Sequence, residues 1–178
     1  SPNKFGIYLF DKKNSKNLYK EELFINSNEN TLNQNELKKF LDSNIYKIEK
    51  LSGKFVENIF VIFEDEKIFN LEFGIKKKNY NTSVTKQYLE NILIEAKDLF
   101  RENYHGQQII HMIVNKYFFN SKSYTSFKEN FICDHLALEI KIKFISNNIV
   151  DTLNKILENY QIKIIRYFDG GYVKNSFN

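Results

Sequence analysis

The spacing of apolar residues between positions 68 and 145 is the feature that most constrains the fold. Residues 68–77 alternate apolar side chains with polar or small ones, as a half-buried strand does. Residues 88–100 place their apolar side chains on one helical face, and residues 109–119 and 136–145 indicate two further strands. This segment therefore predicts a strand-helix-strand-strand unit.

The segment before this unit predicts a hairpin, a helix and a buried strand. Residues 5–10 and 18–25 are apolar-rich and flank the polar turn 11–15, which favours two paired strands. Apolar residues then recur at helical spacing, and residues 56–63 indicate the buried strand. The helical stripe consists of Leu37, Phe40, Leu41, Ile45, Ile48 and Leu51, with Asn33 and Glu36 at its start and Gly53 at its end.

Short polar signals complete this map of elements. Residues 65–67 suit a tight turn, and Ser83 suits the cap of the helix at residues 88–100. A last helix over residues 149–160 leads into a strand at residues 162–168. The Asp-Gly-Gly run at positions 169–171 follows that strand, and we expect it to end the regular structure rather than to bind phosphate.

Composition supports a folded mixed structure. The 178-residue chain contains one proline, Pro2, which favours long uninterrupted elements. Its single cysteine, Cys133, rules out an intrachain disulfide, and we expect it to be a small core residue. The chain begins with Ser1 rather than Met and lacks an apolar run long enough to cross a bilayer. We expect the natural protein to be longer and this piece to be cytoplasmic.

The positive charge does not indicate a nucleic-acid site. The formal net charge is +4, and only Arg101 and Arg166 are arginines. Proteins that bind nucleic acid commonly use arginine for bidentate contacts and cluster their charge on one face. The lysines at positions 76–78 suit either an anionic surface or a solvated strand edge, and we favour the edge.

The sequence shows no motif for catalysis or for metal binding. His105, His111 and His135 are too scattered for a metal-ligand pattern. His111 lies in an apolar strand, where a hydrogen-bonded structural histidine is the favoured interpretation. Neither Ser126 nor Cys133 lies in a motif that would supply a base and an orienting group. We therefore predict no catalytic residue, no cofactor and no metal in this chain.

Four segments carry a resemblance to a known family. Residues 49–61, in which a helix ends at a glycine and a buried strand begins, resemble a segment of the FtsA family of bacterial actin-like cell-division proteins. Residues 110–113 are similar to the His-apolar-apolar-Pro strand of that family, although Val114 takes the proline position. Residues 136–142, and residues 148–150 with the helix beyond, complete the resemblance in family order.

The resemblance implies an α+β fold. Residues 1–67 and 147–178 would form part of an actin-like (ribonuclease H-like) subdomain. Residues 68–146 would form an inserted strand-helix-strand-strand interaction subdomain. Residues 120–134 replace the Gly- and Pro-containing loop of the family, so the surface made by that loop does not carry over.

The resemblance also implies a role. The full-length protein would bind ATP and magnesium, form filaments with itself, tether FtsZ to the inner face of the cytoplasmic membrane at the division septum, and recruit division proteins. The phosphate loops would lie at or before Ser1 and beyond Asn178, and the membrane anchor and main FtsZ surface also beyond Asn178. This fragment would therefore supply protein contacts and no catalysis.

The candidate contact surface consists of Lys116, Tyr117, Phe118 and Phe119, of which alternate residues should point inward. Three alternatives remain open. A pilus-assembly actin homologue resembling PilM would not co-purify with FtsZ. A nucleic-acid-binding α/β protein would show salt-sensitive binding. An enzyme with an unrecognised site would need a deep pocket of convergent polar groups.

Overall fold

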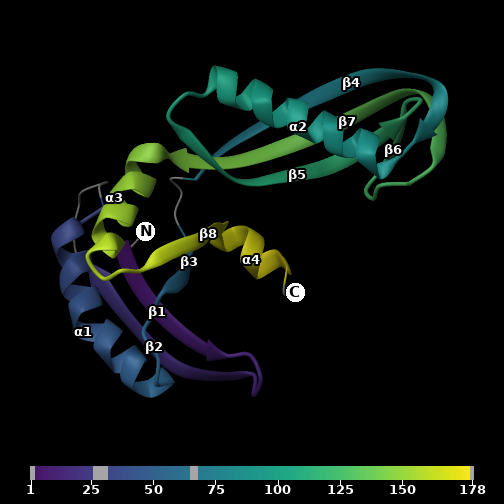
Figure 1. The fold of residues 1–178 in the computed structure, drawn as a ribbon. Coiled ribbons are helices and arrows are strands. Elements are labelled where there is room, and N and C mark those ends of the chain that lie inside the picture. The colour runs from purple at the N-terminus through teal and green to yellow at the C-terminus, as the bar shows by residue number, and fades with distance from the viewer. Residues whose placement is uncertain (1–2, 26–31, 65–67, 177–178) are drawn as a thin grey trace. The chain divides into compact units, whose positions relative to one another are not determined.

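The computed structural model describes residues 3–25, 32–64 and 68–176, so the turn expected at residues 65–67 lies outside the described residues. Helices and strands are both abundant, and the fold class is α+β. Figure 1 shows the elements with their labels. In the described part of the chain, no helix is long and apolar enough to cross a membrane.

The chain divides into two compact units. The first unit comprises residues 1–61 and 151–167, and the second comprises residues 62–150 and 168–178. The resemblance implies an inserted subdomain at residues 68–146. In the structure, the contacts of residues 168–178 group them with the second unit rather than with the first.

The first unit opens with the predicted hairpin. Strand β1 (Asn3–Asp11) pairs antiparallel with β2 (Lys16–Ile25). The Asp11 carboxylate accepts hydrogen bonds from the Lys13 and Asn14 backbone amides, at 2.9 and 3.4 Å, which is the way an Asp side chain stabilises a turn. One face of the hairpin packs on the following helix, with the Phe5 and Phe40 rings 6.2 Å apart.

Helix α1 (Gln34–Ser52) has the predicted caps. The Asn33 side chain accepts from the Glu36 backbone N–H at 3.1 Å, and Gly53 takes the left-handed conformation at φ 68°. The buried face differs from the predicted stripe at three places, because Leu51 is exposed, Ile45 is only partly buried and Asn44 is buried. The Asn44 amide is satisfied there, since it donates to the Phe40 carbonyl at 2.6 Å and accepts from the Tyr19 hydroxyl.

A second small sheet lies mainly in the first unit, and the last residues of its two strands, 62–63 and 168–169, belong to the second unit. Strand β3 (Asn58–Phe63) pairs with β8 (Lys163–Asp169), and α3 (Asn147–Glu158) precedes β8. These elements agree in position with the predicted strand, helix and strand. The expectation of a buried strand at residues 56–63 is wrong, because β3 alternates exposed and partly buried residues, with Phe60 58% and Ile62 50% exposed. The expectation that Gly170 and Gly171 end the regular structure is wrong, because they begin helix α4 (Gly170–Ser176).

The second unit is a four-stranded antiparallel sheet with one long helix (Figure 1). The strands lie in the order β4, β7, β5, β6, and helix α2 (Lys86–Asn103) follows β4. Their bounds are β4 (Phe69–Val84), β5 (Gln107–Phe119), β6 (Lys122–Tyr124) and β7 (Phe131–Ser146). The predicted strand-helix-strand-strand order is present, with the short β6 added between the last two strands.

The core of the second unit lies between α2 and the sheet. The fully buried side chains include Leu136, Leu138, Ile140 and Ile142 from the central strand, and Ala96 from the helix. Cys133 is buried in the same core, as predicted. The cap of α2 is Thr85 rather than the predicted Ser83, because β4 continues through Ser83 before the helix begins.

Candidate interaction surface

Strand β5 carries the four predicted contact residues, and the sheet separates them onto two faces. Tyr117 and Phe119 lie opposite Leu138 and Leu136 of β7 and pack in the core beneath α2. Burial raises the pKa of the Tyr117 hydroxyl, and Phe119 is fully buried. Lys116 and Phe118 lie on the other face, so only they are available to a partner.

A bulge decides this assignment. The register between β5 and β7 shifts between Val114 and Lys116. Before the shift, Met112 and Val114 pack against the core, so strict alternation would have placed Lys116 and Phe118 inside. The extra residue exchanges the two faces, which a sequence pattern of period two cannot predict.

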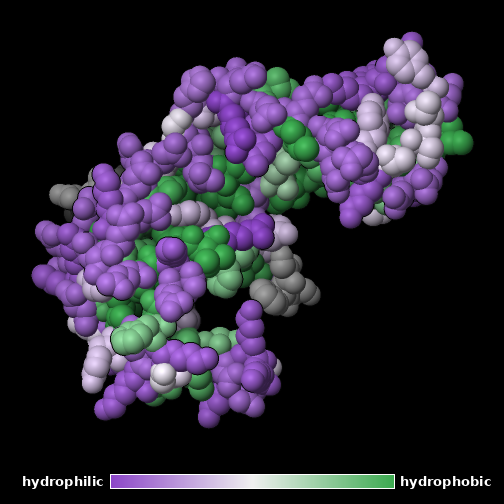
Figure 2. All heavy atoms as spheres, in the orientation of Figure 1, coloured by the Kyte–Doolittle hydropathy of each residue, from purple (hydrophilic) through white to green (hydrophobic). Residues whose placement is uncertain are grey.

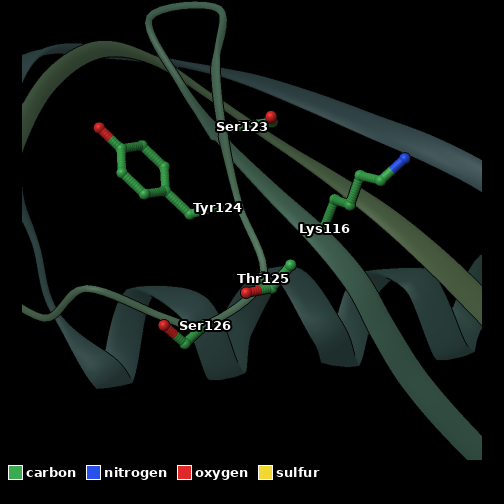
Figure 3. Close-up of a pocket in the computed structure, with 5 residues that line it drawn as sticks. All are labelled: Lys116, Ser123, Tyr124, Thr125 and Ser126. Carbon is green, nitrogen blue, oxygen red and sulfur yellow. The ribbon is translucent and has the colours of Figure 1, made fainter.

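A shallow concavity lies beside Lys116. Its volume is about 300 Å³, and Figure 3 shows the five residues that line it, namely Lys116, Ser123, Tyr124, Thr125 and Ser126. The side chains of Lys116 and Tyr124 point in different directions rather than toward a common point. The Lys116 amine lies 3.6 Å from the Glu139 carboxylate. This lining, which contains neither a histidine nor a carboxylate, does not form a convergent site for a ligand.

The face of the sheet opposite α2, here called the open face, is rich in charge. On β4, the open face is formed by the residues that alternate with the core residues Leu71, Phe73 and Ile75. On β7, it is formed by the residues that pair with these open-face residues of β4. Lys141 pairs with Glu72 at 2.8 Å, and Lys143 pairs with Asp169. Hydrophilic residues dominate the side of the second unit seen in Figure 2, with hydrophobic residues in small groups between them.

Two lysines of the open face differ from the others. Lys76 and Lys78 lie on β4 opposite Ala137 and His135, and neither forms an ion pair with a described carboxylate. The Lys78 amine lies over the Tyr80 ring, 4.8 Å from its centroid. Two ammonium groups without a described carboxylate partner therefore lie near the middle of β4.

Strand β4 is interrupted beside these lysines by a wide bulge. Asn79, Tyr80 and Asn81 lie between the paired positions Lys78 and Thr82, opposite the single residue Asp134. Tyr80 and Asn81 have positive φ values of 51° and 55°, and the Tyr80 side chain is 70% exposed. The sequence signal for this bulge is the Asn-Tyr-Asn-Thr run after the lysines, where the alternation stops.

The Asn79 side chain holds the bulge in place. Its buried amide donates to the Thr82 carbonyl at 2.6 Å and to the Cys133 carbonyl at 3.1 Å. The Thr82 hydroxyl donates in return to the Asn79 carbonyl at 2.7 Å. These bonds satisfy backbone groups that the interrupted ladder would otherwise leave without partners.

A buried polar cluster surrounds His111. Its Nε2 atom accepts from the Asp169 backbone N–H at 3.1 Å, and its ring lies 4.4 Å from that of Tyr172. The Asp169 carboxylate binds the Lys143 amine and caps α4 by accepting from the Tyr172 N–H at 2.7 Å. Burial opposes ionisation of Asp169, but these hydrogen bonds hold the pKa of its carboxyl below the ordinary value.

The cluster explains the structural role predicted for His111. These contacts join the end of β8 and the start of α4 to the sheet, so His111 is a buried, hydrogen-bonded residue as expected. In the described ranges, no group of three or more His, Cys, Asp or Glu side chains is arranged to hold a metal ion.

Comparison with known proteins adds no family. A scan against models of protein families finds no match to this sequence, and a search of curated proteins finds none either. Function is therefore inferred from the fold and from surface chemistry.

Proposed function

We propose that this chain is part of a bacterial actin-like cell-division protein similar to FtsA, in which the second unit supplies protein contacts. The pairing of β3 with β8 is the main support. These two strands are neighbours in one sheet, although β4, α2, β5, β6, β7 and α3 all lie between them in the chain. A module inserted between neighbouring strands is the arrangement that the resemblance implies.

The direction of these strands adds support. Where the strands begin, the N–H of Lys163, the first residue of β8, donates to the carbonyl of Glu57, the residue before β3, at 2.8 Å. Where they end, a Cβ placed on Gly170, the residue after β8, would lie 3.2 Å from the carbonyl oxygen of Phe63, the last residue of β3. The strands therefore run parallel, and parallel neighbours require a crossover such as the one that α3 completes.

In this proposal the chain itself is not an enzyme and holds no cofactor. ATP and magnesium would bind in regions outside this chain. The membrane anchor and the main FtsZ-binding surface would also lie outside it. The full-length protein would assemble with itself at the inner face of the cytoplasmic membrane and at the division septum. There it would tether FtsZ and recruit division proteins.

Co-sedimentation tests the proposal. The full-length protein that contains this chain is mixed with FtsZ polymers from the same organism and with vesicles of anionic phospholipid. We expect FtsZ to move to the vesicle fraction only when the protein and ATP are present. A protein that leaves FtsZ in solution contradicts the division role. Binding to the cytoplasmic tail of a pilus membrane protein would then indicate the PilM-like alternative, and salt-sensitive binding to DNA would indicate the nucleic-acid alternative.

A further inference from the structure

The outer edge of β4 is an open strand edge. In the sheet order β4, β7, β5, β6, strand β4 is terminal, and in the described part of the chain no strand pairs with its outer side. The backbone N–H and C=O groups on that side can therefore bind another extended segment. Gly74 lies near the middle of β4 and has no side chain that could block an approaching backbone. A Cβ added there would have one neighbour within 4 Å, the Leu138 carbonyl oxygen at 3.7 Å, so the space beside Gly74 is open.

The charge at this edge selects the chemistry of such a segment. Of the three consecutive lysines on β4, Lys77 is paired with Glu95 of α2 at 2.6 Å. Lys76 and Lys78 project from the open face without a carboxylate partner among the described residues. Two ammonium groups spaced two residues apart on a strand, neither paired with a carboxylate that the structure describes, match carboxylates at alternate positions of an added strand.

The bulge provides an independent observation. Left-handed backbone is unfavourable for a residue as bulky as Tyr80, yet the buried Asn79 amide holds this conformation. The result is an exposed aromatic ring beside Lys78, at the point where β4 stops being straight. Backbone strain that is maintained by buried hydrogen bonds is common at binding sites.

We propose that the edge of β4 from Gly74 to Tyr80 binds an acidic, extended segment of a partner protein. The segment adds to the sheet as a further strand beside β4. Its alternate carboxylates contact Lys76 and Lys78, and its end packs on the Tyr80 ring. This inference deepens and rests on the proposed contact role of the second unit, but it does not require FtsZ binding, so the two proposals can fail separately.

A peptide-binding experiment tests the inference on the whole 178-residue chain. The probe is a fluorescein-labelled ten-residue peptide of alternating Glu and Val, and its binding is followed by fluorescence anisotropy. Two further probes are the same peptide N-methylated at alternate residues, which blocks edge hydrogen bonds, and a peptide with Lys in place of Glu. We expect binding of the first peptide alone.

Matched variants locate the site. Lys76→Glu with Lys78→Glu should weaken binding about tenfold, because two attractive contacts become repulsive. Lys97→Glu with Lys122→Glu makes the same change of net charge on α2 and on β6, at the opposite side of the sheet, and should leave binding unchanged. Tyr80→Gly should preserve or raise the melting temperature, since glycine accepts positive φ, and should still weaken binding about threefold or more.

The contrary outcomes are distinct. Equal binding of the N-methylated peptide would show charge attraction without strand addition and would overturn the inference. Absence of binding, or an equal loss in the two double variants, would also overturn it. If the chain instead binds phosphatidylglycerol vesicles through Lys76 and Lys78 and ignores the peptide, the edge contacts a membrane surface and the inference is wrong.

Discussion

Along β7, alternate side chains enter two different environments. Leu136, Leu138, Ile140 and Ile142 lie beneath α2 and are at most 1% exposed. Glu139 and Lys141 lie on the open face and form partly exposed ion pairs with neighbouring strands. The buried face holds the sheet together through packing, whereas the open face leaves its side chains accessible to other molecules. One strand thus combines a stabilising surface with an accessible one.

The adjacent residues Phe118 and Phe119 give the largest expected contrast. Phe119→Ala removes a fully buried ring and should lower the free energy of unfolding by about 3–5 kcal/mol. Phe118→Ala, on the open face, should cost only about 1 kcal/mol because the ring is only partly buried there. Urea denaturation of both variants measures the difference. Equal losses would mean that the bulge after Val114 does not exchange the two faces.

The sequence predicts the strand-helix-strand-strand order because burial on one face imposes a visible period on each element. It does not predict which face Lys116–Phe119 occupy, because a single extra residue near Val114 reverses the assignment. Simple alternation from Val114 places Lys116 and Phe118 in the core and Tyr117 and Phe119 on the open face, which is the reverse of the observed arrangement. The sequence could therefore locate the candidate surface on a strand, but only the observed pairing of β5 with β7 shows which of its residues are accessible.

The ends of elements were predicted less well, for related reasons. The bulge at residues 79–81 interrupts the alternation, so the sequence predicts that β4 ends at the lysines and that Ser83 caps the helix. The exposed Tyr80 ring was not predicted for the same reason. Helix α4 was missed because its first residues are Gly170 and Gly171, which have poor helix propensity; there the cap from Asp169 decides the local structure.

The Asp169→Asn variant tests whether the ion pair between Asp169 and Lys143, a residue of the open face, stabilises the fold. Asp169→Asn should lower the free energy of unfolding by about 2–3 kcal/mol at pH 7, since it leaves the Lys143 ammonium without its partner. The effect should be smaller than that of Phe119→Ala because the Lys143 side chain is 18% exposed. Chemical denaturation at pH 7 measures this loss.

The pH dependence of the same variant follows from the depressed pKa of Asp169. A carboxyl with a folded-state pKa below its unfolded value of about 3.9 contributes its full stability above that value. It loses this contribution as the pH falls through the folded-state pKa. The wild-type chain should therefore lose stability more steeply than Asp169→Asn below about pH 4. Parallel curves would indicate that the Lys143 pair does not form in solution.

A matched pair at the start of α2 tests the helix that covers the buried face. The Thr85 hydroxyl accepts from the Tyr88 backbone N–H at 3.2 Å, so Thr85→Ala should cost about 1 kcal/mol. Ser83 lies within β4 and is exposed, so Ser83→Ala should change stability by less than about 0.5 kcal/mol. Thermal unfolding of both variants compares them. The reverse order of effects would restore Ser83 as the cap.

The smallest effect should come from the ion pair between Glu72 and Lys141. Glu72→Gln should lower the free energy of unfolding by about 0.2–0.5 kcal/mol, because the two side chains are 53% and 30% exposed and water screens their attraction. A double-mutant cycle with Lys141→Gln isolates the coupling, which should weaken further at 1 M salt. A coupling above about 1 kcal/mol, insensitive to salt, would mean that this pair is shielded from solvent. The open face would then be a second structural surface, and little of it beyond the Lys76–Tyr80 segment of β4 would be free to bind a partner.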